Sequence, residues 1–351
     1  MGLSMDLQIA LLLGQDGIVN GAIYALLALA LVLVFAVTRV IFIPQGEFVA
    51  YGALTLASVQ MGQTPGTLWL LLLLGVAVTA LDAPALWRQG CGGGAKLYGL
   101  VGRQIVYPFV IAALVLGAQP KDWPMLLQVL LALAVVVPLG PQLYRVAYQP
   151  IAEAPVLILL IVSIALHLTL VGLGLLFFGA EGSRTPAFSD ASFDISGLTI
   201  SGQSLWVIGA SLVLIVALYV FFERSLYGKA LRATAINRAG ARLMGISTTL
   251  AGKLSFLLAA AIGALSGILI APITTIYYDT GFLVGLKGFV GAIVGGLASY
   301  PVAAAGALLV GLLEAFSSFY ASAFKEVIVF TLIIPVLVWR SLTTHHVEEE
   351  E

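Results

Sequence analysis

Apolar runs recur along this whole chain, and each is long enough to cross, or half cross, a lipid bilayer. Several are shorter than the about 20 residues that a spanning helix needs, which indicates half-helices or re-entrant segments buried within protein. The pattern predicts an all-α, polytopic integral membrane protein with about 9–11 membrane helices or half-helices. The runs lie at residues 17–37, 47–61, 67–81, 104–118, 123–140, 155–178, 204–222, 250–271, 283–298, 301–319 and 326–340.

The composition agrees with this fold class and excludes several functions. Hydrophobic residues make up 61% of the 351 positions and charged residues 9%, whereas a soluble domain has about 45–50% and about 25%. A soluble enzyme, a nucleic-acid binder and a disordered chain are therefore excluded. The single cysteine, Cys91, excludes an intrachain disulfide and a cysteine-built zinc site. Since no catalytic constellation can be assembled, we expect no catalytic residue, no metal site, no cofactor in this chain and no enzyme activity.

The basic residues predict the orientation in the membrane. The connection 223–253 carries six Lys and Arg residues against one acid, Glu223, so it should be cytoplasmic. The preceding connection is acidic and should lie outside. We thus expect one transmembrane domain over residues 1–351, in a bacterial inner membrane, with the N-terminus outside. Its further parts are a cytoplasmic linker 82–103, an extracytoplasmic loop 179–203, a cytoplasmic loop 223–249 and a cytoplasmic tail 341–351.

Two of these connections have internal patterns. Residues 193–200 alternate apolar and polar side chains around Ser196-Gly197, which predicts a small β-hairpin that another protein could touch; an ordinary capped loop is the alternative. The linker holds Gly90 and Gly92–Gly94 and should be flexible. It lacks the context of a phosphate-binding loop, so we expect no nucleotide site in this chain.

The basic loop contains a short helix with a signal at each end. Asn237 is a good N-cap, and Gly245 suits the left-handed conformation that follows a helix. The two turns between them form an amphipathic helix, with two arginines one helical repeat apart. It is either a positively charged helix lying on the membrane or a docking helix for a cytoplasmic partner, which the two caps favour. Its candidate residues are Asn237, Arg238, Ala241, Arg242, Leu243, Met244 and Gly245.

Small residues mark the later apolar runs. Gly263 and Gly267 form a GxxxG pattern, which lets two helices approach closely. Gly288, Gly291 and Gly295 keep another run slim, either for tight packing or to line a path whose wall is partly backbone. The break at residues 298–301 indicates a tight turn or a helix interruption.

Polar groups within the runs are few and costly. Glu47 lies at the expected cytoplasmic start of the second run, where a carboxylate suits the helix dipole. Glu314 lies inside a run and needs a partner or a wet cavity. His167 lies in mid-span, where a histidine satisfied within the core is the simpler interpretation. Gln45 precedes Glu47 on the same run.

Taken together, the motifs resemble the permease subunits of bacterial branched-chain amino-acid ABC transporters. The matching segments are Asn20-Gly21-Ala-Ile-Tyr-Ala-Leu27, Gln45-Gly46-Glu47, Tyr144-Arg-Val-Ala-Tyr-Gln-Pro150, Gly228-Lys-Ala-Leu-Arg-Ala-Thr-Ala with Leu243-Met-Gly-Ile246, Gly285-Leu-Lys-Gly-Phe289, Val294-Gly-Gly-Leu297 and Gly311-Leu-Leu-Glu-Ala315. Two features depart from the family. Gln45 stands where a histidine is common, and the stretch 82–143 is longer than expected.

The resemblance implies a role and partners. The chain would form the translocation path for branched-chain or other hydrophobic amino acids, paired with a second permease or a copy of itself. Two ATP-binding subunits, which hold the ATP and Mg, would dock on the helix 237–244, and an extracytoplasmic substrate-binding protein would deliver the substrate. Urea, amides and aromatic or organic acids are alternative substrates, and an ion-coupled secondary transporter is a further alternative. The candidate path residues are Thr274, Thr275, Tyr277, Gly288, Gly291, Gly295 and Glu314.

Overall fold

The computed structural model describes residues 2–88, 98–195 and 198–343, and it confirms the all-α membrane fold. Within these residues, nine helical stretches are long and apolar enough to cross a membrane, and two shorter helices lie among them. The range of 9–11 membrane helices or half-helices is thus confirmed. The nine stretches are Leu7–Thr38, Thr67–Pro84, Tyr98–Gly117, Met125–Ile151, Val156–Phe178, Gly202–Arg224, Thr248–Ile270, Tyr300–Tyr320 and Ser322–Trp339.

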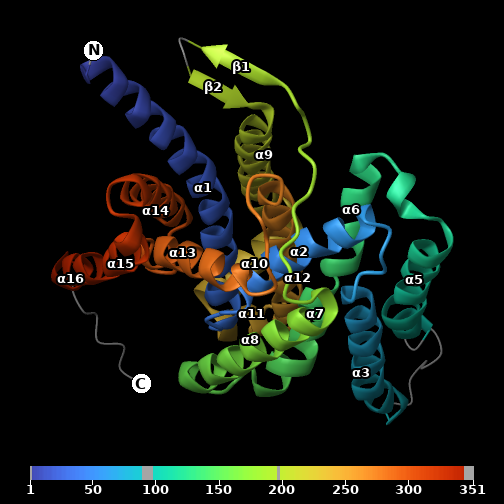
Figure 1. Cartoon of the computed structure of the whole chain (residues 1–351). Coiled ribbons are helices and arrows are strands. Elements are labelled where there is room, and N and C mark those ends of the chain that lie inside the picture. The colour runs from blue at the N-terminus through green and yellow to red at the C-terminus, as the bar shows by residue number, and fades with distance from the viewer. Residues whose placement is uncertain (1, 89–97, 196–197, 344–351) are drawn as a thin grey trace.

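A central group of helices carries most of the core. Helices α1 (Gly2–Thr38), α2 (Gln45–Gln60), α12 (Thr248–Ile270) and α13 (Thr280–Val294) lie in the middle of the molecule (Figure 1). On one side of them stand α3 (Thr67–Arg88), α5 (Tyr107–Gly117) and α6 (Met125–Val136). On the other side stand α14 (Tyr300–Tyr320), α15 (Lys325–Thr331) and α16 (Ile333–Thr343). Helices α8 (Val156–Phe178) and α9 (Gly202–Arg224) lie at the edges.

Short elements complete the spans and connections. The span after α6 continues through α7 (Leu139–Leu143), the π-helix η3 (Tyr144–Tyr148) and the 3-10 turn η4 (Gln149–Ile151). A π-helical turn, η1 (Gly102–Val106), precedes α5. The remaining 3-10 turns are η2 (Pro120–Asp122) and η5 (Ser322–Phe324). Strands β1 (Ser192–Ile195) and β2 (Leu198–Ser201) pair antiparallel, which confirms the hairpin; its expected turn, Ser196-Gly197, lies outside the described residues.

Helices start where the sequence supplies a side-chain cap. Ser201, Ser225 and Ser247 precede α9, α10 (Leu226–Ile236) and α12, and each side-chain oxygen accepts a hydrogen bond from the N–H group three residues ahead. Since the first N–H groups of a helix have no partner within it, these serines define the starts of three helices.

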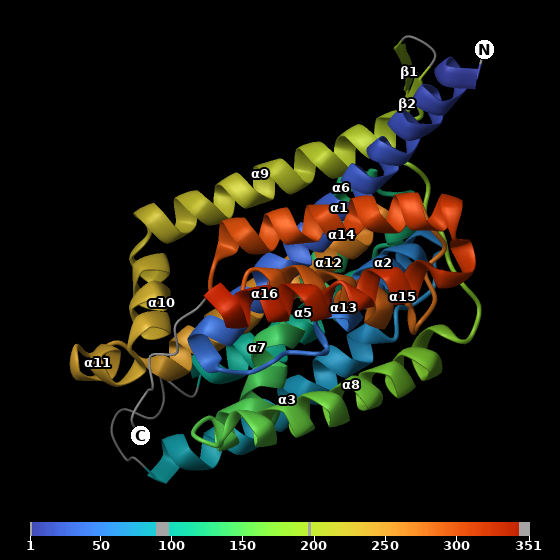
Figure 2. The same cartoon turned by 90° about the vertical axis from the view of Figure 1, so that its left-hand side faces the viewer.

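The bundle has two distinct ends, best seen in Figure 2. At one end lie α10, α11 (Arg238–Leu243) and the last turn of α16, and we call this the basic end. At the other lie the first turns of α1 and the strands β1 and β2, and we call this the hairpin end. The first and last described residues therefore lie at opposite ends of the spans.

Several boundaries differ from the expected ones. Helix α1 begins at Gly2 and not near residue 17, and α3 continues to Arg88, through the first part of the expected linker. The break at 298–301 is a tight turn between α13 and α14, where Gly296 and Leu297 have positive φ values of 65° and 56°. The glycine cluster Gly90–Gly94, with Cys91, and the tail from residue 344 lie outside the described residues.

Candidate functional site

Helix α2 begins in the middle of the membrane span, and not at a membrane surface as the sequence predicted for Glu47. The amide of Gln45 donates to the carbonyl of Ala259 at 2.9 Å, and Glu47 Oε1 lies 2.7 Å from His167 Nδ1. Ala259 is the twelfth residue of the 23-residue α12, and His167 is the twelfth residue of the 23-residue α8. Both contacts fall at helix midpoints, so α2 is a half-helix that runs from mid-membrane to the hairpin end.

A second half-helix, α13, starts at the same depth. Gly46 and Gly281 are the second residues of α2 and α13, and their backbones touch: a methyl group on either would overlap the carbonyl group of the other. Only glycine permits so close an approach. The positive ends of two helix dipoles therefore meet at mid-membrane. We call this place the half-helix junction and define it by Gln45, Gly46, Glu47, Gly281 and Phe282.

The polar side chains of the half-helix junction are buried and only partly satisfied. Gln45 is 0% exposed and Glu47 1% exposed. Among the described residues, Gln45 Oε1 and Glu47 Oε2 have no hydrogen-bond partner. The ring of Phe282 stacks on that of His167, with centroids 4.5 Å apart. The junction thus combines helix N-termini, a carboxylate, an imidazole and an aromatic face at mid-membrane.

The expected path residues of the connection before α13 lie between the half-helix junction and the hairpin end. Thr274, Thr275 and Tyr277 are exposed on a non-helical stretch. The extracytoplasmic loop of the sequence prediction is fastened to this stretch, because Ser183 pairs with Ile276 and Arg184 donates to the carbonyls at 272 and 273, each at 2.8 Å. The structure therefore places the three residues together on one exposed stretch that precedes α13.

The three expected path glycines of α13 face other helices of the same chain. A methyl group at Gly288 would meet Leu27 of α1, and methyl groups at Gly291 and Gly295 would meet Ala307 and Ala303 of α14. These contacts correspond to tight helix packing. The GxxxG pair of α12 has the same role, because Gly263 and Gly267 face Phe48 and Val49 of α2.

Glu314 has the partner that the sequence could not name. Lys287 Nζ lies 2.5 Å from Glu314 Oε1, and the Tyr24 hydroxyl donates to Glu314 Oε2 at 2.5 Å. Glu326 Oε1 lies 3.3 Å from the same ammonium group. Sequence reasoning missed Lys287 and Tyr24, although a lysine inside an apolar run was itself a signal. This cluster joins α1, α13, α14 and α15.

The short helix of the basic loop forms with the predicted caps. Asn237 Oδ1 accepts a hydrogen bond from the N–H group of Gly240 at 2.8 Å, and α11 ends at a Gly245 with φ of 79°. Its N-cap and its C-terminal glycine are as the sequence predicted, and Ala241 is its buried residue. Since both ends are satisfied, the segment has a defined shape although it has only six residues.

The two faces of this helix differ. Arg238 donates to the carbonyl of Ala152 at 3.1 Å, and Arg242 pairs with Glu153 at 2.9 Å and reaches the Thr248 hydroxyl at 3.2 Å. Both arginines thus bind the subunit itself. Leu243 and Met244, in contrast, are 88% and 82% exposed. They form an apolar tip at the basic end, to which we refer below as the α11 tip.

Among the described residues, no group of three or more His, Cys, Asp or Glu side chains is arranged to hold a metal ion. Long apolar helices, a pair of half-helices that meet at mid-membrane and a structured polar loop at one end define a polytopic membrane transport protein of the permease class. Residues 106–337 match the family described as "Branched-chain amino acid transport system / permease component", and the chain belongs to this family.

Curated relatives agree with this family. The chain is 30% identical over 238 residues to the high-affinity branched-chain amino acid transport system permease protein LivH of Salmonella typhimurium, covering 65% of this chain and 77% of that protein. It is 28% identical over 248 residues to the corresponding protein BraD of Pseudomonas aeruginosa, covering 69% of this chain and 81% of that protein. No solved structure matches the chain. The chain is thus a multi-pass inner-membrane permease subunit of the branched-chain amino acid ABC transporter type.

Proposed function

We propose that this chain forms the translocation path of an ATP-driven importer for branched-chain or other hydrophobic amino acids, and that α11 couples it to separate ATPase subunits. The main support for the coupling is the exposure of the α11 tip. Leu243 and Met244 are almost fully exposed on a helix that is capped at both ends and tied to its own subunit. Exposed apolar residues on a rigid polar loop favour contact with another protein.

The arginines have a different part in this proposal. Arg238 and Arg242 bind residues 152–153, which connect η4 to α8. A displacement of α11 by the ATPase subunits would therefore also move the spans on either side of this connection. ATP-driven closure of the ATPase subunits would thereby bias the spans between two arrangements. Leu243 and Met244 would supply the contact, and the arginines the rigidity.

The half-helix junction is the proposed point of substrate recognition. Two helix N-termini favour a carboxylate, Glu47 would bind an ammonium group, and the Phe282 ring offers an apolar surface. Thr274, Thr275 and Tyr277 would form the approach from the hairpin end. Gly288, Gly291 and Gly295 would contribute indirectly, by allowing α13 to pack closely against α1 and α14 beside the path. Glu314 would stabilise the same helices through its ion pair with Lys287.

The proposed assembly holds two permease chains, related or identical, with two ATP-binding subunits and an extracytoplasmic substrate-binding protein. On this proposal the basic end is cytoplasmic, because Lys and Arg concentrate there, and the hairpin end is extracytoplasmic, with the N-terminus outside. ATP and Mg would reside on the partner subunits, so this chain would bear no ATPase site of its own.

Replacement of both tip residues tests the coupling. The chain would be co-expressed with its ATPase subunits, and assembly would be measured by co-purification, with ATPase activity stimulated by the loaded binding protein as a second readout. We expect Leu243→Ser/Met244→Ser to lose assembly or stimulation. Phe193→Ser is the control for assembly, because it removes a half-exposed apolar residue from the hairpin end. Wild-type assembly and stimulation in the tip variant would refute α11 as the coupling helix.

Buried charges within the spans favour a second candidate, an ion-coupled secondary transporter. Glu47 with His167 and Lys287 with Glu314 are intramembrane pairs, and such groups occur in proton and ion relays. Uptake by proteoliposomes that contain this chain alone, driven by a proton or Na⁺ gradient, would establish it. Uptake that requires the ATPase subunits and ATP would support the importer, and competition by urea, amides or aromatic acids would decide among substrates.

A further inference from the structure

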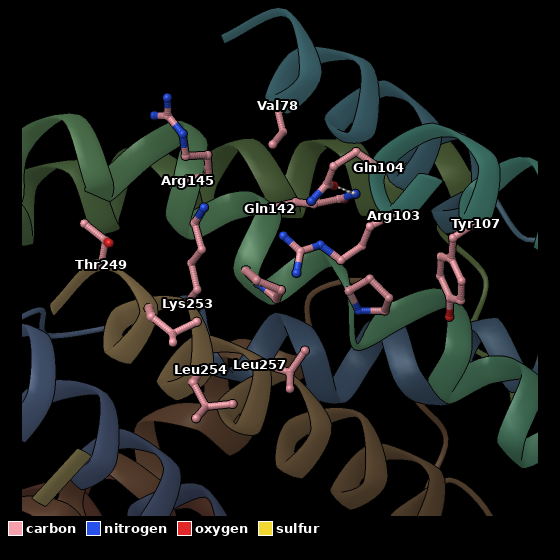
Figure 3. A pocket seen from close by; sticks show the side chains of 13 residues that line it. Val78, Arg103, Gln104, Tyr107, Gln142, Arg145, Thr249, Lys253, Leu254 and Leu257 are labelled. Carbon is pink, nitrogen blue, oxygen red and sulfur yellow. Dashed lines mark hydrogen bonds between the residues drawn. The ribbon is translucent and has the colours of Figure 1, made fainter. Parts of the chain in front are cut away.

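A groove of about 480 Å³ opens at the basic end, and no residue of the half-helix junction or of the α11 tip lines it. It lies between α3, η1, the α7–η3 segment and the first turns of α12 (Figure 3). Its walls are mainly apolar and include Val78, Tyr107, Pro138, Leu254 and Leu257. Neither the coupling helix nor the proposed path accounts for it.

Three cations line the same groove. Arg103, Arg145 and Lys253 come from η1, η3 and α12. Arg145 is neutralised by Asp82, whose Oδ1 lies 2.7 Å from both Nε and Nη2. In the part of the chain that the structure describes, the side chains of Arg103 and Lys253 make neither an ion pair nor a hydrogen bond. Figure 3 shows both side chains reaching into the groove from opposite walls. The groove therefore carries three cations beside an apolar surface, and Asp82, which pairs with Arg145 and also attracts Lys253, is the carboxylate that faces them.

The three cations lie within the last turns of their spans at the basic end. Lys253 lies five residues after the start of α12, Arg103 five residues after the start of its span at Tyr98, and Arg145 six residues before the end of its span at Ile151. At 1.5 Å per residue, each lies about 7–9 Å inside the end of its helix. In a hydrocarbon core of about 30 Å, the backbone of each cation therefore lies inside the core, and only the extended side chain reaches toward the headgroups at the basic end.

A buried amide adds a polar contact to the same wall. Gln142 is 3% exposed, its Nε2 donates to Gln104 Oε1 at 3.0 Å, and its Oε1 has no partner among the described residues. This oxygen is enclosed by protein, so recognition in the groove depends on the cations, and phosphatidylglycerol supplies the phosphate that they would bind.

We propose that this groove binds one anionic phospholipid, whose phosphate lies between Arg103 and Lys253 and whose acyl chain packs along Leu254 and Leu257. Charge complementarity identifies the occupant, because basic pockets between membrane helices bind anionic headgroups. Lysines and arginines that only snorkel toward water would instead point away from the groove. The proposal is independent of the transported substrate and of the ATPase contact.

The test measures lipid retention by the full-length chain. The purified protein would be stripped of lipid in detergent, titrated with phosphatidylglycerol or with phosphatidylcholine of the same chain length, and examined by native mass spectrometry. We expect one tightly held phosphatidylglycerol and weaker binding of phosphatidylcholine. Arg103→Gln/Lys253→Gln should weaken phosphatidylglycerol binding about thirtyfold, since each cation near a membrane surface contributes about fivefold.

Matched variants distinguish the groove from general charge. Arg224→Gln/Lys229→Gln removes two exposed cations from the same end of the spans but outside the groove, and it should bind the lipid as the wild type does. Leu257→Trp fills the groove without a change in charge and should also weaken binding. If the Arg103→Gln/Lys253→Gln variant fails to fold, lipid binding in the groove is still tested by Leu257→Trp and by the comparison of the two lipids on the wild type.

Three results would overturn the proposal. The first is equal retention by the Arg103/Lys253 variant and the wild type. The second is equal loss of lipid in the Arg224/Lys229 control, which would indicate non-specific attraction. The third is full displacement of the lipid by inorganic phosphate alone, which would make the groove a site for a soluble anion.

Discussion

Removal of one member of the Lys287–Glu314 pair should destabilise the fold far more than removal of both. The two side chains are 7% and 12% exposed, and they join α13 to α14 with 2.5 Å between Nζ and Oε1. At an effective dielectric constant of about 20, unit charges about 3 Å apart attract by roughly 5 kcal/mol. That attraction offsets the cost of taking both groups out of water, so most of it is lost when one partner is left alone.

The remaining partners set the expected order of the single variants. Lys287→Met leaves the buried Glu314 with only the Tyr24 hydroxyl, and we expect a loss of about 4–5 kcal/mol. Glu314→Met leaves Lys287 with Glu326 at 3.3 Å, a carboxylate that is 37% exposed, so the loss should be smaller, about 3 kcal/mol. The double variant removes both charges, leaves the Tyr24 hydroxyl without an acceptor and leaves the partly exposed Glu326 without Lys287, which costs about 1–3 kcal/mol.

The assay is unfolding of the detergent-solubilised chain by a denaturing detergent, followed by tryptophan fluorescence. Free energies of unfolding of the wild type, both single variants and the double variant form a double-mutant cycle. We expect the double variant to be more stable than Lys287→Met, although it carries one more substitution. Additive losses, with a double variant about 7 kcal/mol less stable than the wild type, would show that Lys287 and Glu314 do not stabilise each other.

Two further predictions concern the half-helix junction and α11. Gly46→Ala places a methyl group on the carbonyl of Gly281 and should cost about 1–3 kcal/mol in the same unfolding assay; Gly172→Ala, in α8 with open space around it, is the control and should cost nothing. Asn237→Ala removes the cap at the Gly240 N–H group and should cost α11 about 0.5–2 kcal/mol. The second effect should appear as faster amide exchange over residues 238–243, and unchanged exchange would contradict the capping argument.

The spans, the hairpin and α11 could be predicted from sequence because each depends on local signals. Hydropathy over a window identifies a helix, and a cap needs only a suitable residue at each end. Asn237 and Gly245 define α11 within a residue or so of its observed bounds. The hairpin strands likewise follow from alternation over eight residues.

The depth of α2 could not be predicted in this way, because hydropathy reports the length of a segment and not its level in the membrane. A polar Gln45 and Glu47 indicated a helix start at the surface. The connection before them instead returns into the bundle, where Val40 and Phe42 are 2% and 0% exposed. Their apolar character was the available signal that residues 39–44 do not belong in water. The partner of Glu314 could not be predicted for another reason. Lys287 lies 27 residues away on a different helix, and local sequence patterns do not report which helices pack together.

At the half-helix junction, a carboxylate side chain offsets the repulsion between two helix N-termini. Two helices that meet by their N-termini bring like partial charges together, and the contact of Gly46 with Gly281 makes the approach closer than any other residue would permit. Glu47 stands in the first turn of α2 and supplies a carboxylate at this point, and His167 holds one of its oxygens at 2.7 Å. The positive field thus exists whether or not a ligand is present, and Glu47 lies within it. Under the proposed function, the carboxylate of an amino acid would enter the same field, and its admission would require the two half-helices to separate.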